Sequence, residues 1–215
     1  MAEKIKIDIV SDVVCPWCIL GYLRLQAAID ELGISDNIDI DIEWQPFQLN
    51  PNVPKEGVNL HQHLMKKYGM LKMDSDRNRQ QLIKLGLQSG YAFNFFEEMK
   101  TLNTRDAHIL LAFAKSVEKQ TALKTRLFDA YFKEQQDISD RTVLSGLLIE
   151  VGIDAEKAMA QLDDQEAQQA FDAENAYWKE LGVSSVPTFV FNRESAVSGA
   201  QPVETLKQIL QELTP

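Results

Sequence analysis

Residues 5–18 read IKIDIVSDVVCPWC, and this stretch decides how the rest of the chain is interpreted. Apolar and polar residues alternate over 5–10 and end in an apolar pair, which predicts a β-strand. A short turn at 11–14 leads to Cys15. From Pro16 the pattern is helical, and a proline suits the first helical turn because an N–H there has no helical partner. Gly33 is placed to end this helix.

A second strand is predicted at 38–44, where apolar and polar residues alternate for seven positions. A right-handed crossover through the helix would place this strand parallel to the first in one sheet. Prolines mark irregular structure from about 46 to 58. From about 60 to 160 the pattern is helical, with no convincing strand, and Ser139 is the predicted N-cap of one of these helices.

Strand character returns near the C-terminal end of the chain. After a predicted helix at 164–181, residues 188–192 are β-branched and aromatic. A turn at 192–194 then leads to 195–199, which predicts a β-hairpin, and a last helix starts at Pro202. The order of elements predicts an α/β fold in which an all-helical block, 59–163, is inserted between two parts of one domain, 1–58 and 164–215.

The composition disfavours several classes of protein. The 215 residues are 45% hydrophobic and 25% charged, so a sizeable core can be buried. The net charge of −10 disfavours nucleic acid or an anionic membrane as a partner, because both bind basic surfaces. No apolar run approaches the roughly 18 residues of a membrane span, and the first residues lack the apolar core of a secretory signal. We therefore expect a cytoplasmic protein, and the sequence leaves its oligomeric state open.

The chain has two cysteines, Cys15 and Cys18, at the start of the first predicted helix. The N-terminus of a helix stabilises an anion, so the thiol of Cys15 should have a pKa below the ordinary value of ~8.5. Cys18 follows one turn later, within bonding range of Cys15. This placement indicates thiol–disulfide exchange, in which Cys15 attacks a substrate disulfide and Cys18 resolves the mixed disulfide.

Two other uses of the cysteine pair are weighed against this one. A Cys-x-x-Cys is also half of a zinc site, and His61 and His63 could complete a four-ligand set. Those histidines lie beside Gln62 in a polar segment, which is more typical of a solvated helix end, so no metal is predicted. Two simply buried cysteines are the third interpretation, which the strand–turn–helix placement disfavours.

A distant proline supports the redox interpretation. Pro187 stands one residue before the predicted strand at 188–192. Alone it would only open an edge strand. Together with the strand–turn–helix segment, it completes a set of motifs that resembles the DsbA-like branch of the thioredoxin superfamily.

Four segments carry this resemblance, which spans nearly the whole chain and is strongest to the FrnE-like oxidoreductases. They are 11–18 followed by Gly21, Asn-Thr-Arg-Asp-Ala-His at 103–108, the loop at 182–189, and 197–201. The resemblance implies a thioredoxin fold with a helical domain inserted after the second strand. It also implies thiol–disulfide exchange with protein thiols or disulfides, without a tightly bound cofactor.

The resemblance also implies roles for single residues. Pro187 would be cis and face the cysteine pair, and the backbone of Val186 would pair with an extended substrate peptide. Cys15 would be the exposed, attacking thiol, and Cys18 the buried, resolving thiol. His108 could contact substrate or glutathione, although a histidine packed at the domain seam is the favoured interpretation.

The dipeptide between the cysteines departs from that of periplasmic DsbA. Pro16 and Trp17 stand where that protein has proline and histidine. A neutral Trp17 lacks the charge that helps to stabilise a thiolate, so strong oxidising power is not implied. We expect Trp17 to form an exposed aromatic rim for substrate contact.

Glutathione chemistry is the main alternative. The same branch contains kappa-class glutathione transferases and 2-hydroxychromene-2-carboxylate isomerases, which typically place serine where Cys15 stands. A glutathione-dependent transferase or isomerase, with glutathione as co-substrate, is therefore the second hypothesis, and a non-catalytic binding module is the third. Cysteine at both positions favours redox exchange, while the redox direction and the physiological substrate stay open.

Overall fold

The computed structural model describes residues 3–34 and 38–214. Its helices and strands alternate at both ends of the chain and are mainly helical between. In chain order they are β1 (Glu3–Ser11), α1 (Pro16–Leu32), β2 (Ile38–Pro46), β3 (Val58–Asn59), α2 (Leu60–Tyr68), α3 (Lys72–Gln88), β4 (Lys100–Thr101), α4 (Arg105–Ser116), α5 (Gln120–Phe132), α6 (Arg141–Glu150), α7 (Ala155–Ala160), α8 (Gln165–Glu180), β5 (Thr188–Phe191), β6 (Ser195–Ser198) and α9 (Val203–Leu213).

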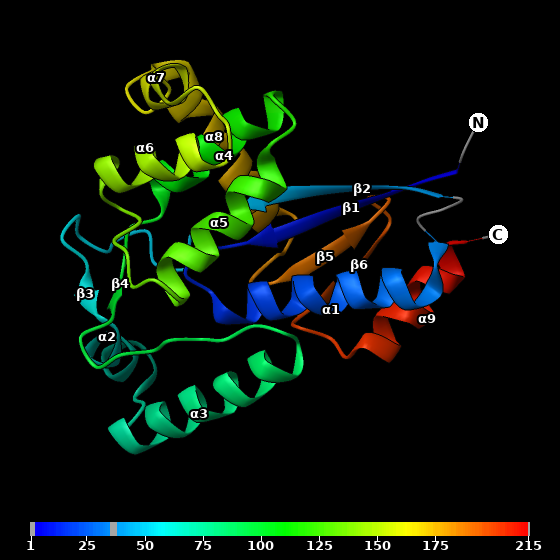
Figure 1. Ribbon diagram of the computed structural model, residues 1–215, viewed down its shortest axis with the longest axis horizontal. Coiled ribbons are helices and arrows are strands. Elements are labelled where there is room, and N and C mark those ends of the chain that lie inside the picture. Colours follow the sequence, from blue (N-terminus) through cyan, green and yellow to red (C-terminus); the bar gives the residue numbers. More distant parts are fainter. Residues whose placement is uncertain (1–2, 35–37, 215) are drawn as a thin grey trace.

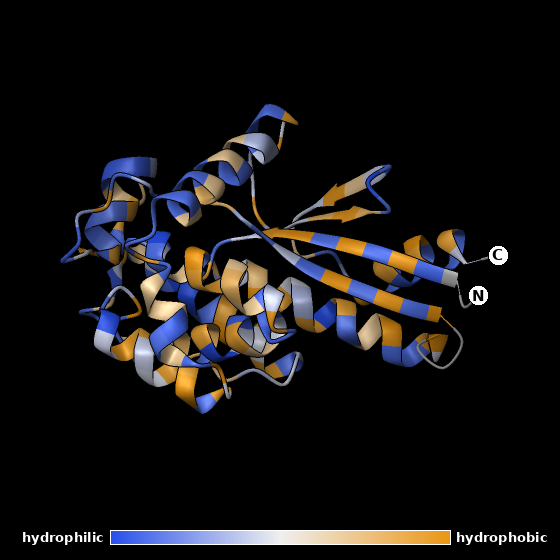
Figure 2. Ribbon diagram, turned by 90° about the horizontal axis from the view of Figure 1, so that it is seen from above, coloured by the Kyte–Doolittle hydropathy of each residue, from blue (hydrophilic) through white to orange (hydrophobic). Residues whose placement is uncertain are grey.

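A four-stranded sheet with the order β2-β1-β5-β6 forms the centre of the molecule. β1 is parallel to β2, as predicted, and antiparallel to β5, which pairs with β6 in the predicted hairpin. Figure 2 shows hydrophobic and hydrophilic residues alternating along the two long strands. In β1 this alternation buries Ile5, Ile7 and Ile9, and each is at most 2% exposed. The polar residues between them point to the other face, since successive strand side chains alternate.

The first and last helices pack side by side along the sheet (Figure 1). As predicted, α1 ends at Gly33, whose φ of 60° is the left-handed conformation that glycine adopts without a steric cost. The Nζ atom of Lys207 on α9 lies 3.0 Å from the carboxylate of Glu31 on α1. No described helix combines the length and the apolar character needed to cross a membrane.

The helices α2 to α7 gather at the carboxyl end of β1, where that strand runs into α1 (Figure 1). This end of the sheet also carries the turn with both cysteines. The helices are therefore placed to form walls around that turn. The predicted domain boundaries, 1–58 with 164–215 and 59–163, remain predictions.

The expectation of no strand between 60 and 160 is wrong at one place. Val58 of β3 pairs with Thr101 of β4, and Asn59 pairs with Lys100, in an antiparallel ladder of two residues per strand. Two residues are too few to show an alternating pattern, so the sequence could not predict this ladder.

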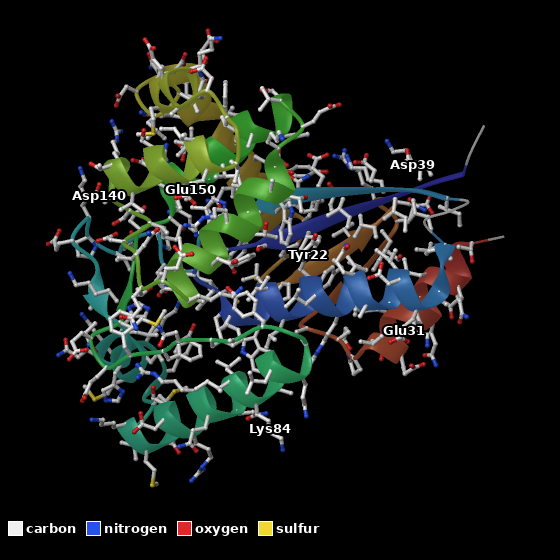
Figure 3. The ribbon with its side chains drawn as sticks, in the orientation of Figure 1. Tyr22, Glu31, Asp39, Lys84, Asp140 and Glu150 are labelled. Atoms are coloured by element: carbon white, nitrogen blue, oxygen red, sulfur yellow. The ribbon has the colours of Figure 1, made fainter. Side chains whose placement is uncertain are left out.

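The predicted N-cap of α6 is also wrong by one residue. Asp140 is the N-cap, and its carboxylate accepts hydrogen bonds from the backbone N–H groups of Thr142 (2.6 Å) and Val143 (3.4 Å). Figure 3 shows Asp140 at the start of the helix. Ser139 instead donates its hydroxyl to Asp137 (2.5 Å). A carboxylate next to a serine competes for the cap, and here the acidic residue takes it.

The packing of α3 gives a test of this fold. A Cβ atom on Gly86 would lie 2.5 Å from the carbonyl oxygen of Tyr91 and 2.6 Å from the ring of Phe93. We predict that Gly86→Ala lowers the free energy of unfolding by about 1–3 kcal/mol, measured by urea denaturation, because backbone would have to move.

Gly146 on α6 is the matched control, because a Cβ atom there would meet nothing within 4 Å. Gly146→Ala should raise the free energy of unfolding by about 0.5–1 kcal/mol, since alanine favours a helix over glycine. Equal stability changes in the two variants would contradict the described packing of α3.

Candidate active site

The turn between β1 and α1 holds both cysteines. Cys15 is the N-cap residue of α1, with an extended backbone (φ −96°, ψ 112°), and Pro16 begins the helix. The N–H of Cys15 donates to the carbonyl of Asp12 (3.2 Å), and the N–H of Cys18 donates to the carbonyl of Cys15 (3.0 Å). Both cysteines are free thiols in this structure. The local sequence therefore places Cys15 where the helix N–H groups converge and Cys18 one turn further on.

A loop from the far end of the chain closes over this turn. The Val186–Pro187 peptide bond is cis, and the thiol of Cys15 donates to the carbonyl oxygen of Val186 (3.7 Å). Gly21 lets α1 approach this loop, because a Cβ atom there would lie 2.9 Å from the ring of Phe189 and 3.1 Å from Pro187. The structure thus brings together Cys15, Cys18, Val186 and Pro187, the four residues singled out from the sequence.

The exposure of Cys15 differs from what the resemblance implies. Its side chain is 4% exposed and that of Cys18 is 0% exposed, so both thiols are buried. Cys15 lies on the wall of a cavity of about 390 Å³. Helices between β2 and α8 supply much of that wall, through Leu60, His63, Leu64, Tyr68, Arg79 and Tyr131. These helices cover the thiol of Cys15, which is why it is not exposed.

Trp17 lies at the rim of the cavity. Its side chain is 39% exposed while one side of it lines the cavity with Pro16 and Val186. This agrees with the predicted aromatic rim. A half-exposed indole offers a large apolar surface to a substrate segment at a small cost in conformational entropy.

The two thiols influence one another's protonation. Hydrogen bonding with Cys18, then burial, raise the pKa of Cys15 well above that of an ordinary thiol. Burial also raises the pKa of Cys18, but hydrogen bonding with Cys15 and with Ser11 and the positive charge of Lys124 outweigh it and leave that pKa lowered. The predicted low pKa of Cys15 is therefore wrong for this reduced form. In a hydrogen-bonded pair one sulfur holds the negative charge, and here the surrounding charges favour Cys18.

A buried hydrogen-bond network supports the turn from below. Asp12 is 1% exposed, and its carboxylate accepts hydrogen bonds from the N–H of Leu49 (2.8 Å) and from Nε2 of His108 (3.2 Å). Burial alone would raise the pKa of Asp12. The hydrogen bonds from His108 and Leu49 and the charge of Lys124 have the larger, opposite effect, so the pKa is lowered overall. Burial lowers the pKa of His108. At neutral pH, Asp12 is ionised and a neutral His108 donates to it.

The surroundings of His108 bear on the two hypotheses for this residue. The side chain is 3% exposed, and its ring stacks on Phe171 with the ring centres 6.0 Å apart. It does not line the cavity that holds Cys15. The ring is occupied beneath the turn by Asp12 and Phe171, which favours the packed histidine, and a contact between His108 and substrate or glutathione stays a prediction.

The zinc alternative receives no support from the placement of the histidines. His63 lies on α2 and is hydrogen-bonded to Asn50 (2.9 Å). Within residues 3–34 and 38–214, no group of three or more His, Cys, Asp and Glu side chains is arranged to hold a metal ion.

Sequence reasoning missed three residues around the site: Asp12, Lys124 and Arg79. Asp12 lies in the motif at 11–18, but no role of its own was predicted for it. Lys124 is buried on α5, and its spacing from the buried Gln120 and Leu127 marks the inner face of that helix. A lysine in this apolar stripe was a signal that could have been used. Nothing in the sequence points to Arg79.

The sequence of this chain is similar to a known protein family and to a protein of Bacillus subtilis. The chain matches the DSBA-like thioredoxin domain family over residues 6–211. It is 28% identical over 215 residues to the uncharacterized protein YwbO of Bacillus subtilis (strain 168), covering 97% of this chain and 96% of that protein.

Two solved structures illustrate the likeness of the fold. The probable DsbA oxidoreductase SCO1869 from Streptomyces coelicolor has a TM-score of 0.88 and 29% identity, over 97% of this chain and 89% of that one. The cytosolic disulfide reductase DsbM from Pseudomonas aeruginosa has a TM-score of 0.67 and 18% identity, over 97% and 98%.

The network at Asp12 predicts a pH-dependent stability. Its folded-state pKa is lowered, so its ionised form stabilises the fold above the unfolded value of ~3.9, and this contribution is lost as the pH falls through the folded value. Asp12→Asn should lower the free energy of unfolding at pH 7 by about 1–3 kcal/mol, because the amide NH₂ would face a donor.

The measurement is urea denaturation of wild type and Asp12→Asn at pH 7, 5, 4 and 3. The difference between the two proteins should shrink below about pH 4, since only the wild type has the titrating carboxyl at this position. A difference that stays constant down to pH 3 would contradict an ionised, hydrogen-bonded Asp12.

Proposed function

We propose that this chain, which belongs to the DSBA-like thioredoxin domain family, is a thiol–disulfide oxidoreductase that acts on protein disulfides through Cys15 and Cys18. The family, and with it the predicted thioredoxin fold with inserted helices, is shown by the match over residues 6–211. The reaction at this cysteine pair, the FrnE-like assignment and the cytoplasmic location belong to the proposal. The 3.7 Å contact between the thiol of Cys15 and the carbonyl of Val186, next to Pro187, carries it.

The chemistry proceeds in two exchanges. The sulfur of Cys15, deprotonated, attacks one sulfur of the substrate disulfide, and the other substrate sulfur leaves and takes up a proton. Cys18 then attacks the sulfur of Cys15, a Cys15–Cys18 disulfide forms, and the substrate leaves with both its sulfurs reduced. Run in reverse, the same steps oxidise a dithiol. Because the protonation of each cysteine depends on that of the other, the negative charge can pass from Cys18 to Cys15 as the substrate enters.

The burial of Cys15 limits which substrates can react. A folded protein surface cannot reach a thiol that is 4% exposed. An extended segment can, if it enters the cavity beside Trp17 and pairs with the backbone of Val186, as in strand addition. We therefore favour unfolded or partly folded proteins, with their disulfides in extended chain, as substrates.

The roles of the two cysteines make a paired prediction. Cys15→Ser should abolish the reduction of insulin disulfides, because no nucleophile remains at the cavity wall. Cys18→Ser should also stop turnover but accumulate a covalent Cys15–substrate mixed disulfide, visible by non-reducing electrophoresis and lost with dithiothreitol. Full activity of Cys15→Ser would contradict the mechanism, as would trapping by Cys15→Ser instead of Cys18→Ser.

A glutathione-dependent reaction is the second candidate, and the cavity favours it by one observation. The cavity volume of about 390 Å³ lies in the range of small-molecule sites. On its wall, Nε and Nη2 of Arg79 are buried without a hydrogen-bond partner among the described residues. A guanidinium with unused donors is suited to a carboxylate, of which glutathione has two. Glutathione would then serve as co-substrate or as the reductant of the disulfide form.

Arg79 and its neighbour Arg77 provide a matched test of this candidate. Arg77 lies on the same helix with its side chain 70% exposed and does not line the cavity. If glutathione binds there, Arg79→Met should weaken its binding at least tenfold in calorimetry, whereas Arg77→Met should leave it unchanged. Equal glutathione binding by both variants would contradict a role of Arg79 in binding glutathione. Turnover that persists in Cys18→Ala would favour a transferase or isomerase over redox exchange.

A further inference from the structure

Lys124 on α5 is a buried lysine whose ammonium has aromatic rings, and no hydrogen-bond acceptor among the described residues, as its neighbours. Its side chain is 0% exposed, and its Nζ makes no hydrogen bond within the described part of the chain. The ammonium lies 5.1 Å from the ring centre of Trp44 and 5.2 Å from that of Phe128. An apolar side chain would fill this place at a lower desolvation cost. Packing alone therefore does not explain a lysine here.

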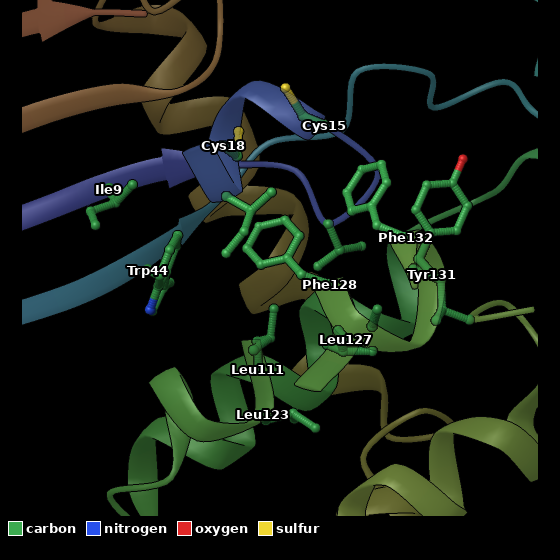
Figure 4. Packing of buried hydrophobic residues seen from close by; sticks show 14 of the residues in the cluster. Ile9, Cys15, Cys18, Trp44, Leu111, Leu123, Leu127, Phe128, Tyr131 and Phe132 are labelled. Atoms are coloured by element: carbon green, nitrogen blue, oxygen red, sulfur yellow. The ribbon is translucent and has the colours of Figure 1, made fainter. Parts of the chain in front are cut away.

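The aromatic neighbours of Lys124 place it beneath the cysteine turn. Phe128 follows Lys124 by one helical turn on the same face of α5. Figure 4 shows Phe128 pointing from α5 towards the first turn of α1, which carries Cys18, with Trp44 on the flank. The negative charges that act on the ammonium come from this turn: Cys18 first, then Asp12 and Cys15.

The other charged groups near Lys124 are already engaged. Behind it lies a cavity of about 370 Å³, whose wall carries Lys124 and His108 together with Glu43, Lys115, Glu174 and Arg193. Glu43 is bound by Lys6 (2.8 Å) and Lys115, and Arg193 lies 3.4 Å from Asp8. Glu174 accepts a hydrogen bond from the indole of Trp178 (2.8 Å). Asp12 is bound by Leu49 (2.8 Å) and His108 (3.2 Å), so the sulfur of Cys18 is the anion that acts most strongly on Lys124.

We propose that Lys124 is a positioning residue, whose buried ammonium stabilises negative charge on the sulfur of Cys18 and so favours the reduced form of the cysteine pair. The inference rests on the proposed redox function. In the resolving step, Cys18 loses its proton, its sulfur bonds to that of Cys15, and the bond from Cys15 to the substrate sulfur breaks. The electron pair leaves with the substrate sulfur, which gains a proton. Lys124 keeps its charge throughout and transfers nothing.

The protonation of Lys124 supports this role. Burial lowers its pKa to about 8, while the charges of Cys18 and Asp12 act in the opposite direction. At neutral pH the ammonium is therefore still mostly charged. A thiolate stabilised in the reduced protein makes the disulfide easier to reduce, so loss of this charge should make the disulfide harder to reduce.

The first experiment compares Lys124→Met with Lys133→Met. Lys133, at the end of the same helix, also lies over an aromatic ring, that of Tyr91 (4.1 Å), but it is no part of the site. In Lys124→Met, we expect the first thiol to titrate about one pH unit higher. The titration is measured by the absorbance of the thiolate at 240 nm. The glutathione equilibrium should shift about tenfold towards the disulfide, a potential about 30 mV lower. Lys133→Met should have the same thiol titration and the same redox potential as the wild type.

Unchanged thiol titration and unchanged potential in a folded Lys124→Met would overturn the proposal. The titration needs no substrate and no disulfide, so it tests Lys124 even if the proposed redox function fails. That function fails separately if the wild type forms no Cys15–Cys18 disulfide in any glutathione buffer.

A second measurement uses the unaltered protein, in case Lys124→Met does not fold. The pKa of Lys124 can be followed by NMR of protein with labelled lysine side chains, in the reduced and in the oxidised form. Forming the disulfide removes the anion at Cys18, so the pKa of Lys124 should fall on oxidation. The same pKa in both forms would overturn the proposal.

Discussion

A carboxylate buried in the protein interior must be satisfied by hydrogen bonds, and Asp12 is satisfied by groups from distant parts of the chain. Its side chain accepts from Leu49 after β2 and from His108 on α4, while its own carbonyl accepts from Cys15. One residue thus fixes the cysteine turn to the loop that leaves the sheet and to the helices that follow. Without these bonds, the ionised Asp12 would be left buried and unpaired, which is far more costly than a lost surface contact.

The helices between β2 and α8 do more than cover the sheet. They bury the thiol of Cys15 inside a cavity and supply two unusual cations, Arg79 on its wall and Lys124 beneath the turn. The strands and α1 bring the cysteines, Val186 and Pro187 together. The helices then decide what can reach these thiols and which of the two sulfurs holds negative charge. In the proposed function, specificity and redox behaviour therefore depend on parts of the chain that contribute no reacting atom.

Features with a strong local signal were predictable from the sequence. Alternation fixed the two long strands, a proline and a glycine marked the ends of α1, and the spacing of Cys15 and Cys18 placed both in one helical turn. The family resemblance added Val186 and Pro187, which lie about 170 residues away, and no local pattern would have joined them to the cysteines.

What the sequence did not predict depends on contacts between distant segments. The ladder of β3 and β4 joins residues about 40 apart. The burial of Cys15 results from side chains on α2, α3 and α5, so exposure could not be judged from the turn alone. The pKa of Cys15 was misjudged for the same reason, because the hydrogen bond with Cys18 and the burial of the thiol raise it.

The central claim is that Cys15 and Cys18 form one redox-active pair. It is tested most directly by equilibrating the unmodified protein in buffers with a graded ratio of reduced to oxidised glutathione, trapping free thiols by alkylation, and measuring the intact mass. The account predicts a single transition in which both thiols are lost together to an internal disulfide. Two thiols that stay free across the whole series, or a protein that only gains one glutathione at Cys15, would contradict it.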